Sequence, residues 1–68
     1  MILMEKLRRD AGLSQRKLGR ACQPEVDPSY ICNAERHGFR LYPTQAQRIA
    51  AALGYEGDPA DLFEAVEL

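Results

Sequence analysis

The sequence predicts a compact all-α fold of five short helices, arranged as a single domain over residues 1–68. Three observations lead to this prediction. Apolar residues recur with the spacing of a helix, no segment alternates convincingly as a strand would, and glycine and proline interrupt the chain at short intervals. Helices joined by such short turns pack against one another as a bundle.

The first two helices are indicated by an apolar repeat and by a capping residue. The first covers about residues 3–11, and Gly12 is suited to end it in the left-handed conformation. Its repeat consists of Leu3, Met4, Leu7 and Ala11. Ser14 then stands where a helix cap belongs and predicts a second helix over residues 14–22. The positions of this helix that we expect to be buried are Leu18, Ala21 and Cys22.

The middle of the chain predicts a close contact, a turn and a third helix. Gly19 costs its helix about 1 kcal/mol relative to alanine, which predicts a packing reason such as the close crossing of another helix. The turn that follows contains Pro24, which disfavours helix at the residue before it. Asp27-Pro28 then combines an acidic cap with a proline in the first helical position. The third helix is therefore expected over residues 28–36.

Two further helices are expected toward the C-terminus. Thr44 is placed to cap a fourth helix that ends at Gly54. Its apolar face consists of Ala46, Ile49, Ala50 and Leu53. A second aspartate-proline pair, Asp58-Pro59, predicts a short fifth helix. Its apolar residues are Leu62, Phe63 and Val66.

The net charge of −1 conceals an uneven distribution of charge along the chain. All nine lysines and arginines lie within residues 1–48, together with five acidic residues, so this part has a net charge of +4. Residues 49–68 contain five acidic residues and no lysine or arginine. The first part can therefore face phosphate groups, whereas the last part would be repelled by them.

The third expected helix has two different faces. One face is small and mostly apolar, suited to packing, and consists of Ile31, Ala34 and Glu35. The other carries hydroxyl, amide and guanidinium groups, from Ser29, Tyr30, Asn33 and Arg36. Such groups can hydrogen-bond to DNA, and an asparagine can pair with adenine through two hydrogen bonds. The alternative is an ordinary solvated helix face.

Cationic residues on both sides of this helix favour the DNA-binding interpretation. The first turn of the second helix contains Gln15, Arg16 and Lys17. Free backbone N–H groups at this helix start also favour a phosphate. Arg36 and Arg40 follow the third helix. Residues 14–36 are therefore predicted to form a helix-turn-helix unit that inserts residues 28–36 into the DNA major groove.

Several short stretches of the chain, in this order and at this spacing, are typical of one family. They are Leu7-Arg8, Gly12-Leu13-Ser14-Gln15, Leu18, Ile31, Glu35-Arg36, Gly38, Pro43-Thr44 and Ile49-Ala50-Ala51-Ala52-Leu53-Gly54. Over about residues 3–63 the chain resembles the lambda-repressor-like, Cro/C1 or Xre-type helix-turn-helix family. The resemblance implies five helices, of which the second and third bind double-stranded DNA.

The resemblance also implies roles for individual residues. The positions that contact bases in the family fall on Pro28, Ser29, Tyr30 and Asn33. Contacts with the DNA backbone are implied at Gln15, Arg36 and Arg40, beside the basic Arg16 and Lys17. Arg8 and Glu35 match a pair that in some relatives forms a partly buried ion pair between the first and third helices. The chain departs from the family in a longer turn before Pro28, in Gly19 and in an additional residue, His37.

These features predict a small transcriptional regulator of repressor or controller type. One short recognition helix gives limited affinity, so we expect a homodimer that binds a two-fold symmetric DNA operator. The chain contains no apolar run long enough for a signal peptide or a membrane span. We therefore expect a cytoplasmic, nucleoid-associated protein without a cofactor and without a membrane partner.

The other chemistries that the sequence offers are weaker. Cys22, Cys32 and His37 lack the closely spaced cysteine pair of structural zinc sites, so we expect free thiols and no metal. A bundle of 68 residues can hardly enclose a catalytic pocket, so we predict no enzyme activity.

The alternative function is a protein-interaction module, such as an antitoxin or adaptor that uses the same fold to bind a protein partner. The acidic fifth helix offers a surface for such a partner or for a dimer seam. We expect Leu62 and Phe63 to close the core, and Val66 and Leu68 to be the more exposed pair.

Overall fold

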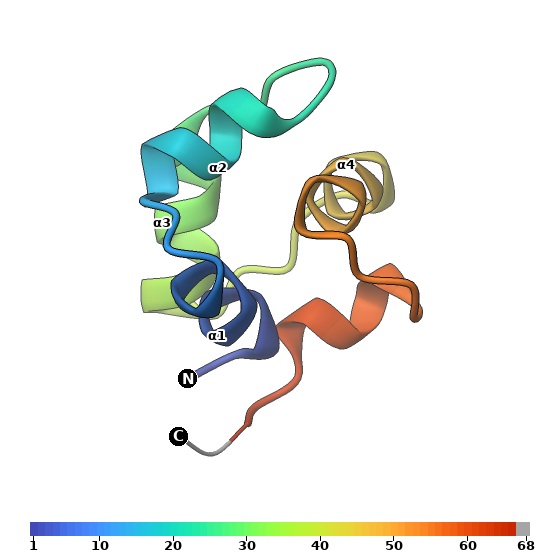
Figure 1. Cartoon of the computed structure of the whole chain (residues 1–68). Coiled ribbons are helices and arrows are strands. Elements are labelled where there is room, and N and C mark those ends of the chain that lie inside the picture. The colour runs from blue at the N-terminus through green and yellow to red at the C-terminus, as the bar shows by residue number, and fades with distance from the viewer. Residues whose placement is uncertain (67–68) are drawn as a thin grey trace.

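The computed structural model describes residues 1–66, which form four α-helices and a final 3-10 helix (Figure 1). The elements are α1 (Leu3–Asp10), α2 (Gln15–Ala21), α3 (Pro28–His37), α4 (Pro43–Leu53) and η1 (Pro59–Phe63). α2 and α3 lie together on one side of the molecule and α4 and η1 on the other, with α1 below α2 and α3 near the N-terminus (Figure 1). With extents of 29 × 22 × 22 Å, the predicted compact all-α domain is confirmed, and residues 1–66 contain no strand beyond a single bridge.

Side-chain caps begin three of the elements where the sequence places them. The Ser14 hydroxyl accepts a hydrogen bond of 3.0 Å from the backbone N–H three residues later. The Asp27 carboxylate accepts one of 2.9 Å from the N–H two residues later, and Asp58 does the same, also at 2.9 Å. Proline follows both aspartates, where its missing N–H costs no helical hydrogen bond. Ser14, Asp27 and Asp58 therefore fix the starts of α2, α3 and η1.

The predicted cap of the fourth helix is wrong. α4 begins at Pro43, Tyr42 is the residue before it, and no side chain caps this end. Thr44 thus lies inside the first turn rather than in front of it. A proline in the first helical position has the right backbone angle and lacks the N–H that a cap would satisfy, so the helix starts two residues earlier than Thr44 predicts.

The fifth element is a 3-10 helix of five residues, not the α-helix that the apolar spacing predicts. Val66 lies beyond its end, and Leu68 lies outside the described residues. After η1 the chain runs alongside the N-terminus, where the N–H of Leu3 donates to the carbonyl of Glu64 at 2.9 Å. The N–H of Val66 likewise donates to the carbonyl of Met1 at 2.8 Å. This pairing holds the segment extended and leaves Val66 half-buried rather than exposed.

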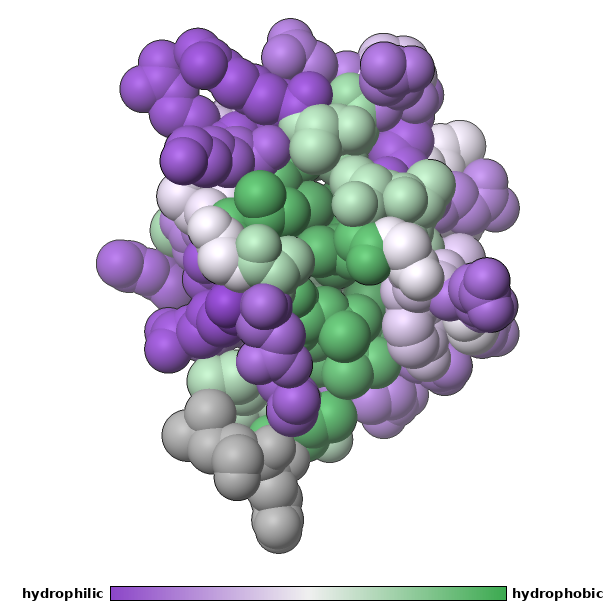
Figure 2. All heavy atoms as spheres, viewed as in Figure 1, coloured by the Kyte–Doolittle hydropathy of each residue, from purple (hydrophilic) through white to green (hydrophobic). Residues whose placement is uncertain are grey.

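The core receives apolar side chains from all five elements and from the turn before α3. Its buried members are Met4, Leu18, Cys22, Val26, Ile31, Ala34, Ile49, Ala50 and Leu62. Figure 2 shows the partly covered rim of apolar residues as a strip down the face where α1, α2, α4 and η1 meet, flanked by hydrophilic side chains. Ala21 is exposed, against expectation, because the buried line of α2 runs from Leu18 to Cys22 and leaves Ala21 at its margin.

Gly19 does mark a close contact, but its neighbour is a turn rather than another helix. A Cβ atom at Gly19 would collide with the carbonyl oxygen of Val26. The carbonyl of Gly19 also accepts a hydrogen bond of 3.0 Å from the N–H of Val26. The backbone of the long α2–α3 turn is therefore fastened directly to α2, and this contact sets the point from which α3 departs.

The described helices are short. The longest, α4, has 11 residues, whereas a helix needs about 20 to cross a bilayer. Within residues 1–66 no helix has both the length and the apolar character that such a crossing demands.

Candidate nucleic-acid interface

A partly buried ion pair joins α3 to α1. The Arg8 guanidinium donates to the Glu35 carboxylate through Nε at 2.8 Å and through Nη2 at 2.9 Å. Its third nitrogen, Nη1, donates to the carbonyl of Leu13 at 2.8 Å. The side chains of Arg8 and Glu35 are only 12% and 3% exposed, so little water reaches the pair. The ion pair expected between these two residues is present and has the two-pronged geometry in which arginine binds a carboxylate most strongly.

Gln15 connects α2 to the same carboxylate. Its Nε2 donates to Oε1 of Glu35 at 3.1 Å, so Glu35 accepts hydrogen bonds from both α1 and α2. The hydrogen bond with Glu35 raises the pKa of Arg8, although burial of the guanidinium works in the opposite direction. Gln15 therefore joins α2 to the ion pair between α1 and α3, and its contact with a DNA phosphate stays a prediction.

The two faces predicted for α3 are separated in the structure. Ile31 and Ala34 are buried in the core. The polar side chains of the other face are all exposed, namely Ser29, Tyr30, Asn33 and Arg36. Pro28 lies half-buried in the first turn, at the edge of this face. Its ring can offer only van der Waals contact to a ligand, because proline has no side-chain hydrogen-bonding group.

Ion pairs neutralise the lysine and arginine side chains of α1 but not those of the later residues. Lys6, Arg8 and Arg9 each pair with a carboxylate, at distances of 2.8 or 2.9 Å. Within residues 1–66 the six basic side chains after α1 form no ion pair. They are Arg16, Lys17, Arg20, Arg36, Arg40 and Arg48. The positive charge available to an anionic ligand therefore belongs to α2, α3 and the segments after them.

Two grooves bring part of this charge next to α3. One, of about 330 Å³, lies at the α2–α3 turn and places Arg16 near Pro28. The other, of about 240 Å³, lies between α3 and the start of α4 and places Arg40 near Tyr30 and Asn33. The predicted backbone contacts Arg16 and Arg40 thus flank predicted base contacts. Lys17 and Arg36 are exposed but line neither groove.

Part of the second groove, which we call the aromatic groove, was not predicted from the sequence. Besides Tyr30, Asn33 and Arg40, its lining consists of Phe39, Leu41, Tyr42 and Gln45. The sequence assigned no role to these four side chains. Two aromatic residues beside an arginine in a short loop were the signal that could have revealed them.

The two cysteines are both free thiols and differ in burial. The Cys22 thiol is buried and donates to the carbonyl of Leu18 at 3.3 Å. Burial raises the pKa of this thiol, with a smaller opposing effect of Arg48, so it stays protonated at neutral pH. Cys32 is half-buried, and His37 is the last residue of α3, with its ring 6.1 Å from that of Phe39. In the part of the chain that the structure describes, no three histidine, cysteine, aspartate or glutamate side chains come together as metal ligands.

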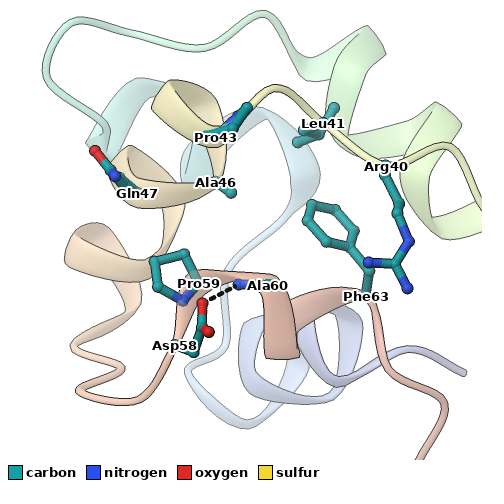
Figure 3. Close-up of a pocket in the computed structure, with 9 residues that line it drawn as sticks. All are labelled: Arg40, Leu41, Pro43, Ala46, Gln47, Asp58, Pro59, Ala60 and Phe63. Atoms are coloured by element: carbon teal, nitrogen blue, oxygen red, sulfur yellow. Dashed lines mark hydrogen bonds between the residues drawn. The ribbon is translucent and has the colours of Figure 1, made fainter.

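A third groove, of about 370 Å³, separates the start of α4 from η1 (Figure 3). The ring of Phe63 points from η1 toward Leu41, and Asp58 at the other end accepts its capping hydrogen bond from Ala60 (Figure 3). Leu62 is fully buried and Phe63 is half-buried, so Leu62 closes the core while Phe63 also faces this groove.

Comparison with known proteins gives no relative from which a function could be transferred. No protein-family model, curated protein or solved structure matches this chain. The candidate interface is therefore defined by its own residues and their arrangement.

Proposed function

We propose that the chain is a sequence-specific DNA-binding protein with a lambda-repressor-like fold, acting as a small transcriptional regulator of repressor or controller type. In this proposal α2 and α3 form the helix-turn-helix unit, and α3 enters the major groove. The observation that supports it best is the exposed polar face of α3, a helix that is fastened through Glu35 to Arg8 of α1 and Gln15 of α2. A rigid helix that presents amide, hydroxyl and guanidinium groups matches the donor and acceptor pattern of base edges.

Asn33 is the residue best suited to select a base. It is exposed in the middle of the polar face, and its amide can donate to N7 and accept from N6 of one adenine. Ser29 and Tyr30 precede it on the same face and can hydrogen-bond to neighbouring bases or phosphates. Pro28 contributes shape rather than hydrogen bonds.

The lysine and arginine side chains that form no ion pair supply the part of the affinity that does not depend on the DNA sequence. The proposed backbone contacts are Gln15, Arg16, Lys17, Arg36 and Arg40. Each lysine or arginine that neutralises a phosphate releases counterions, so binding weakens as the salt concentration rises. Two acidic residues of the last third, Asp58 and Glu64, stand at the start and the end of η1.

Selection of bound duplexes from a random DNA pool tests the proposal. We expect one enriched motif with two-fold symmetry, because a homodimer presents α3 twice, about one helical turn of DNA apart. Sedimentation with the selected duplex should then show two protein chains per DNA. Absence of any enriched sequence would contradict the proposed function, and a complex with one chain would contradict the homodimer.

The phosphate contacts can be tested separately through the salt dependence of binding. Arg16→Ala should weaken binding to all sequences and reduce the slope of log Kd against log salt by about one unit. Arg9→Ala is a matched control, because Arg9 is exposed but paired with Glu5 on α1. Equal slopes for native protein and Arg16→Ala would exclude a phosphate contact at Arg16.

A second candidate function is binding of a protein partner, as in an antitoxin or an adaptor. The groove between α4 and η1 favours it, since this groove has a largely apolar lining that includes Leu41, Pro43 and Phe63 (Figure 3). Arg40 and Asp58 give it opposite charges within the same lining. Co-purification of a protein partner that Phe63→Ala no longer retains, with no DNA selected, would favour this function over DNA binding.

A further inference from the structure

The aromatic groove beside α3 gathers all the large apolar side chains that the described residues expose. These are Tyr30, Phe39 and Tyr42, with 44%, 60% and 72% of their surface accessible. They come from α3, from the following loop and from the residue before α4. Single exposed apolar residues are ordinary, but a cluster around one groove is typical of a binding surface.

The same groove contains an unsatisfied acceptor. Oε1 of Gln45, in the first turns of α4, is buried and has no hydrogen-bond partner among the described residues. Buried side-chain oxygens in folded proteins nearly always have a partner. Gln45 lines the groove, so a change of its side-chain rotamer can present this oxygen to an N–H donor on a bound molecule.

The charge of the groove favours DNA over a basic protein partner. Arg40 is the one charged residue in its described lining, which contains no carboxylate. The grooves at the α2–α3 turn and beside η1 both contain aspartate, at Asp27 and Asp58 respectively. The aromatic groove is thus the one of the three that combines a cation with the absence of acidic side chains.

The groove is also continuous with the proposed reading face, since Tyr30 and Asn33 belong to both. We propose that it receives the major-groove edge of one A·T base pair, an inference that rests on the proposed DNA-binding function. The thymine methyl group packs against the rings of Phe39 and Tyr42, and the adenine N6 amino group donates to Oε1 of Gln45. A·T is the base pair that presents both a methyl group and an amino donor in the major groove, whereas G·C presents a donor without a methyl group.

The methyl contact can be tested with base analogues in the selected duplex. Replacing thymine by deoxyuridine removes only the C5 methyl group. At one thymine of each half-site we expect the affinity to fall about fourfold, which corresponds to the burial of one methyl group. Tyr42→Ala and Phe39→Ala should bring this thymine-to-deoxyuridine ratio close to one, and Tyr42→Phe should preserve it because the ring remains.

The amino contact is tested in the same way. Purine in place of adenine removes the N6 amino group. The native chain should bind the purine duplex more weakly than the adenine duplex, whereas Gln45→Ala should bind the two duplexes equally. Gln47→Ala is the matched control, since Gln47 is exposed on the same helix and lines the groove between α4 and η1 instead. Thermal unfolding of each variant verifies that it is folded at the temperature of the binding assay.

The results separate this inference from the function on which it rests. A chain that binds a selected duplex but shows no dependence on any thymine methyl group overturns the A·T proposal and leaves DNA binding intact. A methyl dependence that persists in Phe39→Ala and Tyr42→Ala also overturns it. If those variants bind every duplex as the native chain does but sediment as monomers, the aromatic groove is a contact between protein copies instead. If no duplex is selected at all, the proposed function itself fails.

Discussion

Replacing Glu35 by leucine tests whether α3 is held by its ion pair with Arg8. Glu35 accepts two hydrogen bonds from Arg8 and one from Gln15. Its removal leaves the Arg8 guanidinium in a site where 12% of the side chain is exposed, with the Leu13 carbonyl as its remaining acceptor. Loss of one partner of such a buried pair costs about 3–5 kcal/mol, since the other charge stays desolvated and unpaired.

This loss is large for so small a domain. A chain of this length is expected to have a free energy of unfolding of about 3–10 kcal/mol. Glu35→Leu should therefore lose a third or more of its stability. The double variant Arg8→Met with Glu35→Leu removes both charges and fills the site with apolar groups, so we expect it to recover to within about 1 kcal/mol of the native chain.

Urea unfolding followed by circular dichroism measures these differences for the native chain, both single variants and the double variant. The double-mutant cycle gives the coupling between the two residues directly. Single variants that each cost less than about 1 kcal/mol and add independently in the double variant would refute the reasoning. The pair would then behave as a solvent-screened surface contact, and another feature would have to hold α3.

Three further predictions concern local contacts. Gly19→Ala should lower the free energy of unfolding by about 1–3 kcal/mol in urea titration, because the added Cβ meets the carbonyl of the turn before α3; a gain in stability, as helix propensity alone predicts, would show that the turn yields. The hydrogen bond from the Ser29 N–H lowers the pKa of Asp27, so the capping contribution of Asp27 to stability is present above about pH 4 and is lost as the pH falls through the lowered pKa. Asp27→Ala should therefore flatten the acid side of the curve of unfolding free energy against pH. An unchanged curve would contradict this. In the native chain iodoacetamide should label Cys32 before the buried Cys22, as mass spectrometry of Cys32→Ser and native protein can show, and equal rates would contradict the burial of Cys22.

The helix starts and ends could be predicted where one residue type carries the signal. Ser14 and the two aspartate-proline pairs are local caps, and their hydrogen bonds reach only two or three residues along the chain. Gly12, Gly38 and Gly54 take the left-handed backbone with φ of 71° that ends a helix. Such features need no knowledge of the rest of the fold.

Two departures from the predictions involve contacts that the neighbouring residues do not determine. η1 stops after five residues and Val66 leaves it, because the chain there pairs with Met1 and Leu3 at the opposite end of the sequence. Gly19 is explained by a turn whose path depends on Val26 entering the core. No local pattern contains these constraints.

The candidate site was predictable in part for the same reason. The exposed face of α3 follows from helical periodicity, so Asn33 could be placed on it from the sequence. The aromatic groove joins that face to Phe39, Tyr42 and Gln45, which belong to two later elements. Their convergence depends on how α4 packs and could be seen only in the folded chain.

The central claim, that the exposed face of α3 reads a DNA sequence, is tested most directly with Asn33→Ala. Its affinity is measured for the selected duplex and for a set of duplexes that each differ by one base pair. Native protein should lose about 1–3 kcal/mol when the base pair read by Asn33 is changed, and Asn33→Ala should lose this preference at that position alone. An equal loss of affinity for every duplex, or no loss for any of them, would contradict the account.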